Sequence, residues 1–483
     1  RVPMELDPLI LSRIQFAFVV SFHAIFPVFT IGLASYIAVL EGLAFKTENP
    51  LWVKLSAFWT KVFAVVFGMG VVSGIVMSFQ FGTNWSNFAQ ASANFLGPIL
   101  SYEVVTAFFL EAAFLGVLLF GRDKVPAGVH LFAAIMVATG TFISSFWILS
   151  ANSWMQTPAG TELRDGVFYV TSWSEAIFNP SFPYRFAHMA LASFLTGGFV
   201  VAGVSAWYLL RGREVEANKK ALSMCLWLLL FIAPAQAVLG DFHGLNTLEH
   251  QPTKVAAMEG NWETSRNVPL LLFAIPDQEN QRNLFEIGIP SLASFILTHE
   301  WDGEVPGVSA VPVDEQPPVA IVFWSFRIMV GIGLLMIAFA VTGLVLRAGG
   351  RYWRTNWFLQ GMRFMSIAPF FAVLTGWFVT EVGRAPWLVY GQMTQAQALT
   401  PSLTGGMALF TLIGYIVVYA LVFSAGVYYL MRVLYVGLED HDEDEHEAER
   451  PKRPFSAAHV PFEIDHDSGD TVGTAKPVNQ GGH

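Results

Sequence analysis

The chain has 483 residues, of which 54% are hydrophobic and only 13% carry a charged side chain. This composition is too apolar for an ordinary soluble protein and predicts a membrane protein that crosses the bilayer several times. The net charge of −10 lies largely in the residues after Gly437, so it describes a tail and not a binding surface. Nucleic acid is therefore not expected as a partner.

Nine segments are long and apolar enough to cross a bilayer as helices, which takes roughly 20 residues each. In chain order they cover residues 14–42, 56–80, 94–120, 126–150, 185–210, 220–240, 317–346, 356–381 and 403–434. Residues 1–13 lack the layout of a cleaved signal, so the first segment is expected to stay in the membrane. The fold class expected is an all-α integral membrane bundle of about nine helices.

Basic residues collect in alternate connections between these segments. The set comprises Lys46, Lys54, Arg122, Lys124, Arg211, Arg213, Lys219, Lys220, Arg347, Arg351 and Arg354. Basic loops face the cytoplasm in most membrane proteins. The N-terminus is therefore expected outside and the C-terminus in the cytoplasm, as nine spans require.

The chain divides into four parts on this reading. Residues 1–240 hold helices one to six, and residues 317–435 hold helices seven to nine. Residues 241–316 form an outer loop that is too long to be a mere connector. Residues 436–483 form an acidic tail that is expected to be disordered. No internal repeat is evident, which weakens an interpretation as a secondary transporter built from inverted halves.

Ionisable residues at membrane depth are costly and are therefore candidates for function. Lys61 and Arg363 carry less weight because their long side chains can reach the cytoplasmic surface. For each histidine, a ring bonded to a neighbouring helix is the alternative to a functional role. The candidates within the spans are His23, Glu103, Glu111, His130, His188, Arg327 and Glu381.

Histidine is the commonest protein ligand of haem iron, and methionine can serve as the second axial ligand. His188 lies near the outer start of its helix, and Met329 would lie at a comparable depth in another helix. The two side chains could meet across the bundle. Packing in the core is the alternative for Met329, because the chain holds 15 methionines.

Glu103 and Glu111 lie eight residues apart in "SYEVVTAFFLEAAF". In a regular α-helix this spacing separates them by about 80° around the axis and about 12 Å along it, so both can line one inner face. Carboxylates spaced in this way can pass protons through water. The alternative is a pair of protonated acids hydrogen-bonded to neighbouring helices.

Glu381 and Arg384 stand in "GWFVTEVGRAPW", where a long apolar segment ends. The simplest explanation is that the helix reaches water there. Glu381 is nevertheless one of several residues that lie within motifs of a known family. The motifs are "LSRIQFAFVVSFHAIF", "SYEVVTAFFLEAAFLG", "SFWILSANSWMQTPAG", "FPYRFAH", "TKVAAMEGNWET", "FWSFRIMVG" and "GWFVTEVGRAPW".

These motifs, in this order, resemble subunit I of the cytochrome bd family of quinol oxidases over nearly the whole chain. The resemblance implies a complex in the bacterial cytoplasmic (inner) membrane that reduces O2 to water with electrons from ubiquinol or menaquinol. It also implies two haem b groups and one haem d, or a further haem b in place of d. The expected partner is subunit II in a heterodimer, with small single-helix subunits as optional additions, and separate proton uptake and release would make the enzyme electrogenic without a pump.

The resemblance assigns a role to each buried candidate. His188 and Met329 correspond to the axial ligands of the low-spin haem b. His23 corresponds to the ligand of the oxygen-reducing high-spin haem, and Glu381 to the ligand of the other high-spin haem. Glu103 and Glu111 correspond to acids near the high-spin pair, where oxygen reduction consumes protons.

Further family positions surround the haems. Arg384 corresponds to a cation that compensates negative charge on haem propionates or on the ligand itself, as planar guanidinium groups do well. Arg327 corresponds to a cation that opposes the propionates of the low-spin haem. Trp377 corresponds to a tryptophan between haems, with packing as the alternative, and Asn152 to an asparagine near them, with a helix end as the alternative. Ala385 departs from the family, which usually has glutamine there.

In the outer loop, Lys254 and Glu259 correspond to residues of the family's quinol-oxidation site. A glutamate beside the quinol hydroxyl can accept its proton, and a lysine can hold the ring oxygen. A solvated charged pair is the alternative. The loop resembles the shorter version in the family, which the cyanide-insensitive oxidases share.

Two other functions compete with the oxidase. A b-type cytochrome anchor for a quinone-linked dehydrogenase would need stacked pairs of histidines, and an ion transporter would bind cations with its buried carboxylates. Haem content distinguishes the oxidase from the transporter.

Overall fold

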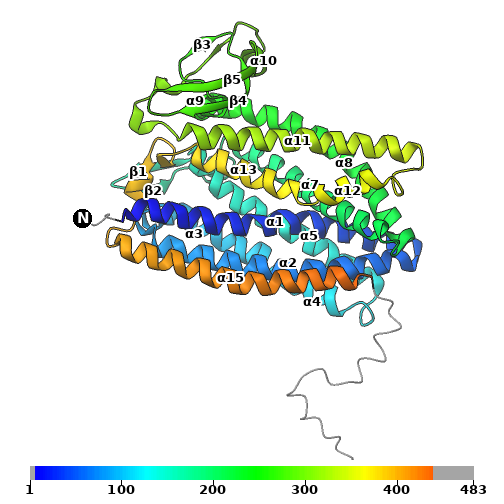
Figure 1. Ribbon diagram of the computed structural model, residues 1–483. Coiled ribbons are helices and arrows are strands. Elements are labelled where there is room, and N and C mark those ends of the chain that lie inside the picture. The colour runs from blue at the N-terminus through cyan, green and yellow to red at the C-terminus, as the bar shows by residue number, and fades with distance from the viewer. Residues whose placement is uncertain (1–5, 439–483) are drawn as a thin grey trace, which may run out of the picture. The chain divides into compact units, whose positions relative to one another are not determined.

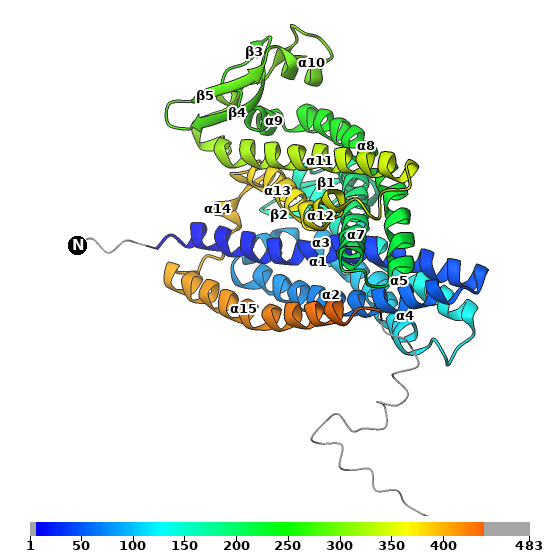
Figure 2. The ribbon, with the colours of Figure 1, turned by 45° about the vertical axis from the view of Figure 1, so that its right-hand side comes forward.

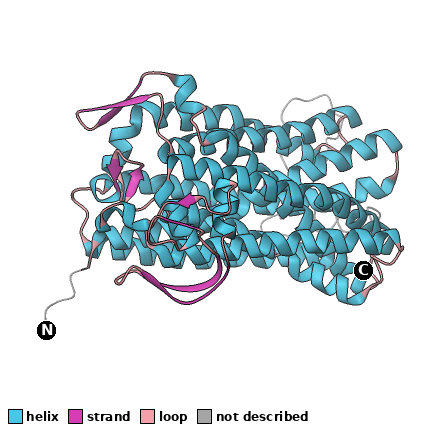
Figure 3. Ribbon diagram, turned by 90° about the horizontal axis from the view of Figure 1, so that it is seen from above, coloured by secondary structure: helices cyan, strands magenta, loops and turns pink. Residues whose placement is uncertain are grey.

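The computed structural model describes residues 6–438. Within this range nine helices are long and apolar enough to cross a membrane, as predicted. Figures 1 and 3 show them side by side in one bundle. They are α1 (Pro8–Thr47), α2 (Pro50–Thr83), the helix Ser86–Phe120, α5 (Ala127–Gln156), α7 (Phe182–Leu210), α8 (Val215–His250), α11 (Val319–Ala348), the pair α12 (Asn356–Met365) and α13 (Ala368–Val382), and α15 (Gly405–Val436).

Local sequence sets where the first helices begin. The Asp7 side chain accepts a hydrogen bond from the backbone N–H of Leu9, and Pro8 occupies the first turn of α1. Asn49 and Pro50 repeat this arrangement at the start of α2. A polar cap followed by proline satisfies the free N–H groups of a helix start and fixes its backbone direction. The turn between α1 and α2 is consequently very short.

In the described part of the chain the strands form four two-stranded antiparallel sheets, all in connections at the end of the bundle where α1 begins (Figure 3). The largest is the hairpin of β4 and β5, which lies beside the start of α11 (Figure 2). The strands are β1 (Thr161–Arg164) with β2 (Val167–Val170), β3 (Ser265–Arg266) with β6 (Glu304–Val305), β4 (Leu270–Asp277) with β5 (Arg282–Ile289), and β7 (Trp387–Val389) with β8 (Met393–Thr394). Short helices in the same connections are α6 (Trp173–Ile177), α9 (Pro252–Glu259), α10 (Leu292–Thr298) and α14 (Gln395–Ala398).

The sixth spanning helix differs from the prediction, because α8 continues past residue 240 to His250. The predicted boundary at 241 rested on the polar residues that follow. Asn246 donates a hydrogen bond to the carbonyl of Pro180, so this polar group is satisfied by packing and the helix need not end. The helix stops just before Pro252, which lacks a backbone N–H. The connection between α8 and α11 therefore starts at residue 251.

The third spanning helix contains a π-helical segment, Val104–Phe108, between α3 (Ser86–Glu103) and α4 (Phe109–Phe120). Hydrogen bonds from each residue to the fifth residue before it widen this turn. The angle of about 80° around the helix axis between Glu103 and Glu111, which assumes a regular α-helix, is therefore wrong. The wider turn rotates Glu111 relative to Glu103, and both contact α5.

Helix α1 is central, because it packs against α2, α5, α7 and α15. Its approach to α7 depends on two glycines. A Cβ atom on Gly32 would lie 2.2 Å from the carbonyl oxygen of Ser193, and one on Gly197 would lie 2.9 Å from the backbone of Gly32. Small residues allow this close backbone contact between membrane helices. The contact fixes the separation of the helices that carry His23 and His188.

The predicted disordered tail, residues 436–483, lies almost entirely outside the described residues, which end at 438. Helix α15 reaches Val436, close to the predicted end of the last span.

Candidate functional site

Glu381 lies near the end of α13, at the centre of a cluster of buried polar side chains that we call the Glu381 group. One carboxylate oxygen accepts a hydrogen bond from Asn152 Nδ2 at 3.0 Å, and the other accepts one from Arg384. Arg384 is only 2% exposed. The explanation that this helix simply reaches water is therefore wrong. The structure brings Asn152, Glu381 and Arg384 together, as the family positions predict.

A second guanidinium enters the same group and was missed by the sequence analysis. Arg185, in the first turn of α7, is buried and donates a hydrogen bond to Asn152 Oδ1. Its position three residues before His188 places both on one face of the helix. That spacing was a usable signal, although Arg185 sits at the predicted edge of the span.

Arg384 and Arg185 both carry N–H donors that the described residues leave without an acceptor. Within residues 6–438, Nε and Nη1 of Arg384 and Nη1 of Arg185 are buried without a hydrogen-bond partner. Buried donors on charged groups are expensive unless an acceptor meets them. A haem carries two propionate carboxylates, and guanidinium groups bind carboxylates well. The residues around Glu381 therefore fit a haem.

His188 has a free ring nitrogen in a confined place. Its Nδ1 is buried with no partner among the described residues, and a Cβ on Gly240 of α8 would lie 3.3 Å from its Cε1. Met329 is similarly confined, because a Cβ on Gly376 would lie 3.0 Å from its sulfur. The glycines keep both potential ligand atoms clear of neighbouring side chains. The pairing of His188 with Met329 on one iron stays a prediction.

His243 of α8 also lies beside His188, with ring centroids 5.5 Å apart. His243 is absent from the predicted candidates, because the predicted span ends at residue 240. Its polar character was visible, but only the continuation of α8 to His250 places it at the depth of His188.

His23 of α1 has the hydrogen bonding expected of a metal ligand. Its Nδ1 lies 3.0 Å from Ser73 Oγ, whose own hydroxyl donates to the carbonyl of Gly70 at 2.9 Å. Ser73 therefore acts as the acceptor, so the proton of His23 sits on Nδ1 and leaves the lone pair of Nε2 free. A Cβ on Gly74 would lie 3.1 Å from His23 Cε1, so glycine keeps this side of the ring open.

Both ring nitrogens of His130 have hydrogen-bond partners. This agrees with the alternative given for each histidine, a ring bonded to its neighbours. Its Nδ1 meets Glu41 Oε2 at 2.9 Å and its Nε2 meets the carbonyl of Leu118 at 3.1 Å. Glu41 also accepts hydrogen bonds from Ser56 and Arg122. Glu41 is absent from the predicted candidates, although it is an ionisable residue within the first span. This cluster ties α1, α2 and α5 together away from the Glu381 group.

Glu103 and Glu111 both contact α5. Glu103 accepts a hydrogen bond from Ser144 at 2.7 Å, and a Cβ on Gly140 would lie 2.5 Å from Glu111 Cγ. Ser144 and Gly140 are one helical turn apart, so the acids do line one face, as expected. Oε1 of Glu111 is buried without a partner in the described part of the chain.

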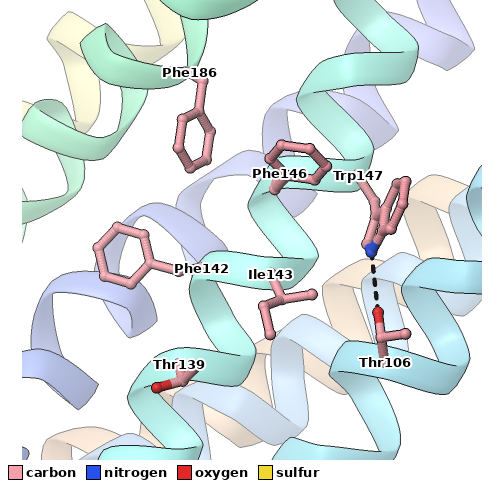
Figure 4. Close-up of a pocket in the computed structure, with 7 residues that line it drawn as sticks. All are labelled: Thr106, Thr139, Phe142, Ile143, Phe146, Trp147 and Phe186. Atoms are coloured by element: carbon pink, nitrogen blue, oxygen red, sulfur yellow. Dashed lines mark hydrogen bonds between the residues drawn. The ribbon is translucent and has the colours of Figure 1, made fainter. Parts of the chain in front are cut away.

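A shallow, open pocket of about 380 Å³ lies near these acids, between the π-helical segment, α5 and α7 (Figure 4). Its lining is mostly aromatic, and Trp147 Nε1 donates to Thr106 Oγ1 at 2.9 Å. None of the candidate residues is among the described residues that line it. They are Thr106, Thr139, Phe142, Ile143, Phe146, Trp147 and Phe186.

Lys254 and Glu259 of α9 are not a solvated pair, so that alternative is wrong. Lys254 is 4% exposed and donates to Gln156 Oε1 at 2.7 Å and to Gln251 Oε1 at 2.5 Å. Burial lowers the pKa of Lys254 well below its usual range; the nearby guanidinium groups lower it further, and Glu381 opposes them. Glu259 is 6% exposed and faces a different partner, Arg327.

Arg327 lies in α11, two residues before Met329, and its side chain links α11 to the connection between α8 and α11. Its Nη2 donates to Glu259 Oε2 at 2.7 Å, and its Nε donates to the carbonyl of Leu271 in β4. Arg327, which is close in sequence to the predicted low-spin haem ligand Met329, thus forms an ion pair with Glu259, the predicted base for quinol. Trp377, one turn before Glu381, has a buried Nε1 with no partner within the described range.

Comparison with known proteins assigns this arrangement to a family. Residues 11–438 match the family model described as cytochrome bd terminal oxidase subunit I. The chain is 36% identical to cytochrome bd ubiquinol oxidase subunit 1 of Bacillus subtilis, over 93% of this chain and 98% of that protein. It is 32% identical to cytochrome bd-II ubiquinol oxidase subunit 1 of Escherichia coli, over 89% and 97% of the two chains.

A solved structure agrees with these relatives. The bd oxidase from Geobacillus thermodenitrificans matches with a TM-score of 0.82 and 30% identity, over 90% of this chain and 99% of the other. The b-type cytochrome anchor and the ion transporter are thereby set aside. The chain belongs to the cytochrome bd terminal oxidase subunit I family.

Proposed function

We propose that His23, His188, Met329 and Glu381 hold the haem irons of this oxidase, and that Lys254 and Glu259 serve its quinol. As a member of its family, the chain is subunit I of a terminal respiratory oxidase that oxidises membrane quinol and reduces O2. It works with subunit II, carries haem, and crosses the bacterial inner membrane several times. The observation that supports the haem sites most strongly is the set of buried, unpartnered arginine donors beside Glu381.

The ligand assignment follows the chemistry of each side chain. His188 and Met329 would hold a low-spin haem b, because two protein ligands would leave its iron no open position for O2. His23 offers its free Nε2 to the oxygen-reducing haem, and Glu381 offers a carboxylate oxygen to the other high-spin haem. The set comprises two haem b groups and one haem d, or a further haem b in place of d. When bound, these groups supply the electron transfer and the reduction of O2.

Charged side chains around the ligands have supporting roles. Arg384 and Arg185 neutralise Glu381 and bind propionate carboxylates, while Asn152 orients one oxygen of Glu381. Trp377 offers, near the same residues, an indole N–H that has no partner among residues 6–438.

Glu103 and Glu111 carry protons from the cytoplasmic side. Their contact residues on α5, Ser144 and Gly140, lie one helical turn apart, and Ser144 can pass a proton to Glu103 through its hydroxyl. The N-terminus then lies outside and the basic connections lie in the cytoplasm. Bilayer lipid surrounds the assembly, and small single-helix subunits are optional additions to it.

Quinol oxidation takes place at the outer face beside α9. The Glu259 carboxylate accepts the proton of the quinol hydroxyl, and its pairing with Arg327 holds it in place. Lys254 donates two hydrogen bonds to glutamine oxygens, and in its protonated form it has a third N–H that can fix a quinol oxygen. Positioned bases of this kind contribute about 10² to 10⁴ in rate.

Replacing Glu259 by glutamine tests the quinol site. The amide keeps the shape but cannot accept the proton, so kcat/KM for quinol is expected to fall about 100-fold. The haem spectrum of the purified complex should stay unchanged. Glu263→Gln, an exposed glutamate in the same connection, is the matched control. Quinol oxidation at the wild-type rate in Glu259→Gln would rule out Glu259 as the base.

A further inference from the structure

We propose that Gln156 is a positioning residue that joins Lys254 of the quinol site to the Glu381 haem site. This inference rests on the proposed function of both sites. Gln156 ends α5 and is 2% exposed. It had no role in the sequence analysis, although it lies in the motif that contains Asn152.

The Gln156 amide uses its full hydrogen-bonding capacity between the two sites. Its Oε1 accepts from Lys254 Nζ at 2.7 Å and from Gln251 Nε2 at 3.2 Å. Its Nε2 donates to Glu381 Oε1 and to the carbonyl of Thr380, both at 3.4 Å. An amide has two donor hydrogens and two acceptor lone pairs, so none is left over.

The direction of this amide is fixed by its neighbours. Both donors, Lys254 and Gln251, lie on one side, and both acceptors, Glu381 and Thr380, lie on the other. A flipped amide would turn its NH2 toward two donors and its oxygen toward two acceptors. Gln156 therefore has a single stable orientation.

Backbone packing holds the bridge together. Gln251 Nε2 also donates to the backbone carbonyl of Gln156 at 2.9 Å, which ties the start of α9 to the end of α5. A Cβ on Gly383 would lie 2.9 Å from Lys254 Cγ, so glycine lets Lys254 lie against the turn between Glu381 and Arg384.

One neutral group thus contacts a cation of the quinol site and the carboxylate proposed as an iron ligand. A change in the position of Lys254 when quinol binds would move the same amide that donates to Glu381. A second carboxylate in place of Gln156 could hold Lys254 but would face Glu381 with like charge. A neutral amide is the group that serves both neighbours.

Gln156→Leu and Gln156→Glu test the bridge in the purified two-subunit complex. Leucine removes both contacts, so we expect about a tenfold rise in KM for quinol together with a shifted band and midpoint potential of the high-spin haem. Glutamate keeps the acceptor for Lys254, so KM should stay within about twofold while the high-spin haem still shifts. The band of the low-spin haem should not move in either variant.

Gln15→Leu is the matched control. Gln15 is a fully buried bridging amide that contacts Asn84 and Thr411, outside both sites. If Gln156→Leu alters KM alone, the high-spin haem alone, or neither, relative to Gln15→Leu, the bridge is wrong. If Gln156→Leu does not assemble, Gln156→Glu decides, and an unshifted high-spin haem there overturns the inference. A wild-type complex without haem would instead refute the proposed function.

Discussion

Replacing Glu381 by alanine is expected to remove one high-spin haem from the purified complex and to abolish O2 reduction. The variant deletes a proposed iron ligand and leaves Arg384 and Arg185 without their shared buried anion. Removing one member of a buried ion pair typically costs about 3 to 5 kcal/mol, so the local structure should also loosen. The measurement is haem content per subunit I together with the carbon monoxide difference spectrum.

Two further variants separate ligation from charge. Glu381→Gln keeps the size and an oxygen atom but removes the negative charge, so haem retention should be intermediate. Glu175→Ala, at an exposed glutamate of α6, should leave haem content unchanged. A full complement of haem with normal spectra in Glu381→Ala would exclude Glu381 as a ligand.

Replacing His188 by alanine is expected to remove the absorption band of the low-spin haem and to stop electron transfer from quinol. Met329 alone leaves one axial position without a protein ligand, which would change the spin state of any haem that remains. The reduced-minus-oxidised spectrum of the isolated complex measures the band, and quinol oxidation measures its consequence.

His130→Ala is the matched control for His188. Both histidines are within spans, but both ring nitrogens of His130 are already engaged by Glu41 and Leu118. Its loss should weaken the helix packing without removing a haem band. Unchanged bands in His188→Ala would contradict the assignment of the low-spin ligand.

Hydropathy and charge predicted most of the fold. The nine spans stand out because lipid demands long apolar helices, and the alternate basic connections supported the same count. The end of α8 was not predictable in this way. Residues 241–250 are mostly polar, and packing against neighbours such as Pro180 explains why they remain helical.

The face shared by Glu103 and Glu111 was predicted, but for an incomplete reason. Spacing in a regular helix left the two acids well apart in azimuth, whereas the π-helical turn between them alters that angle. No residue in Val104–Phe108 marks such a turn in the sequence, because apolar residues suit α and π hydrogen bonding alike.

The surroundings of the site could be predicted only in part. Family motifs pointed to Glu381, Arg384 and Asn152, which the structure brings together. The burial of Lys254 was not visible, since a lysine at the start of a polar connection usually faces water. Its partner Gln156 lies far away in the sequence, so only the fold reveals their contact.

Iron ligation by this chain underlies every role proposed for its buried histidines, Met329 and Glu381. The direct measurement is the haem content and optical spectrum of the wild-type complex, purified from membranes and reduced with dithionite. We expect extractable haem, a low-spin b band and high-spin bands that respond to carbon monoxide. A folded, assembled complex that carries no haem would contradict the central claim.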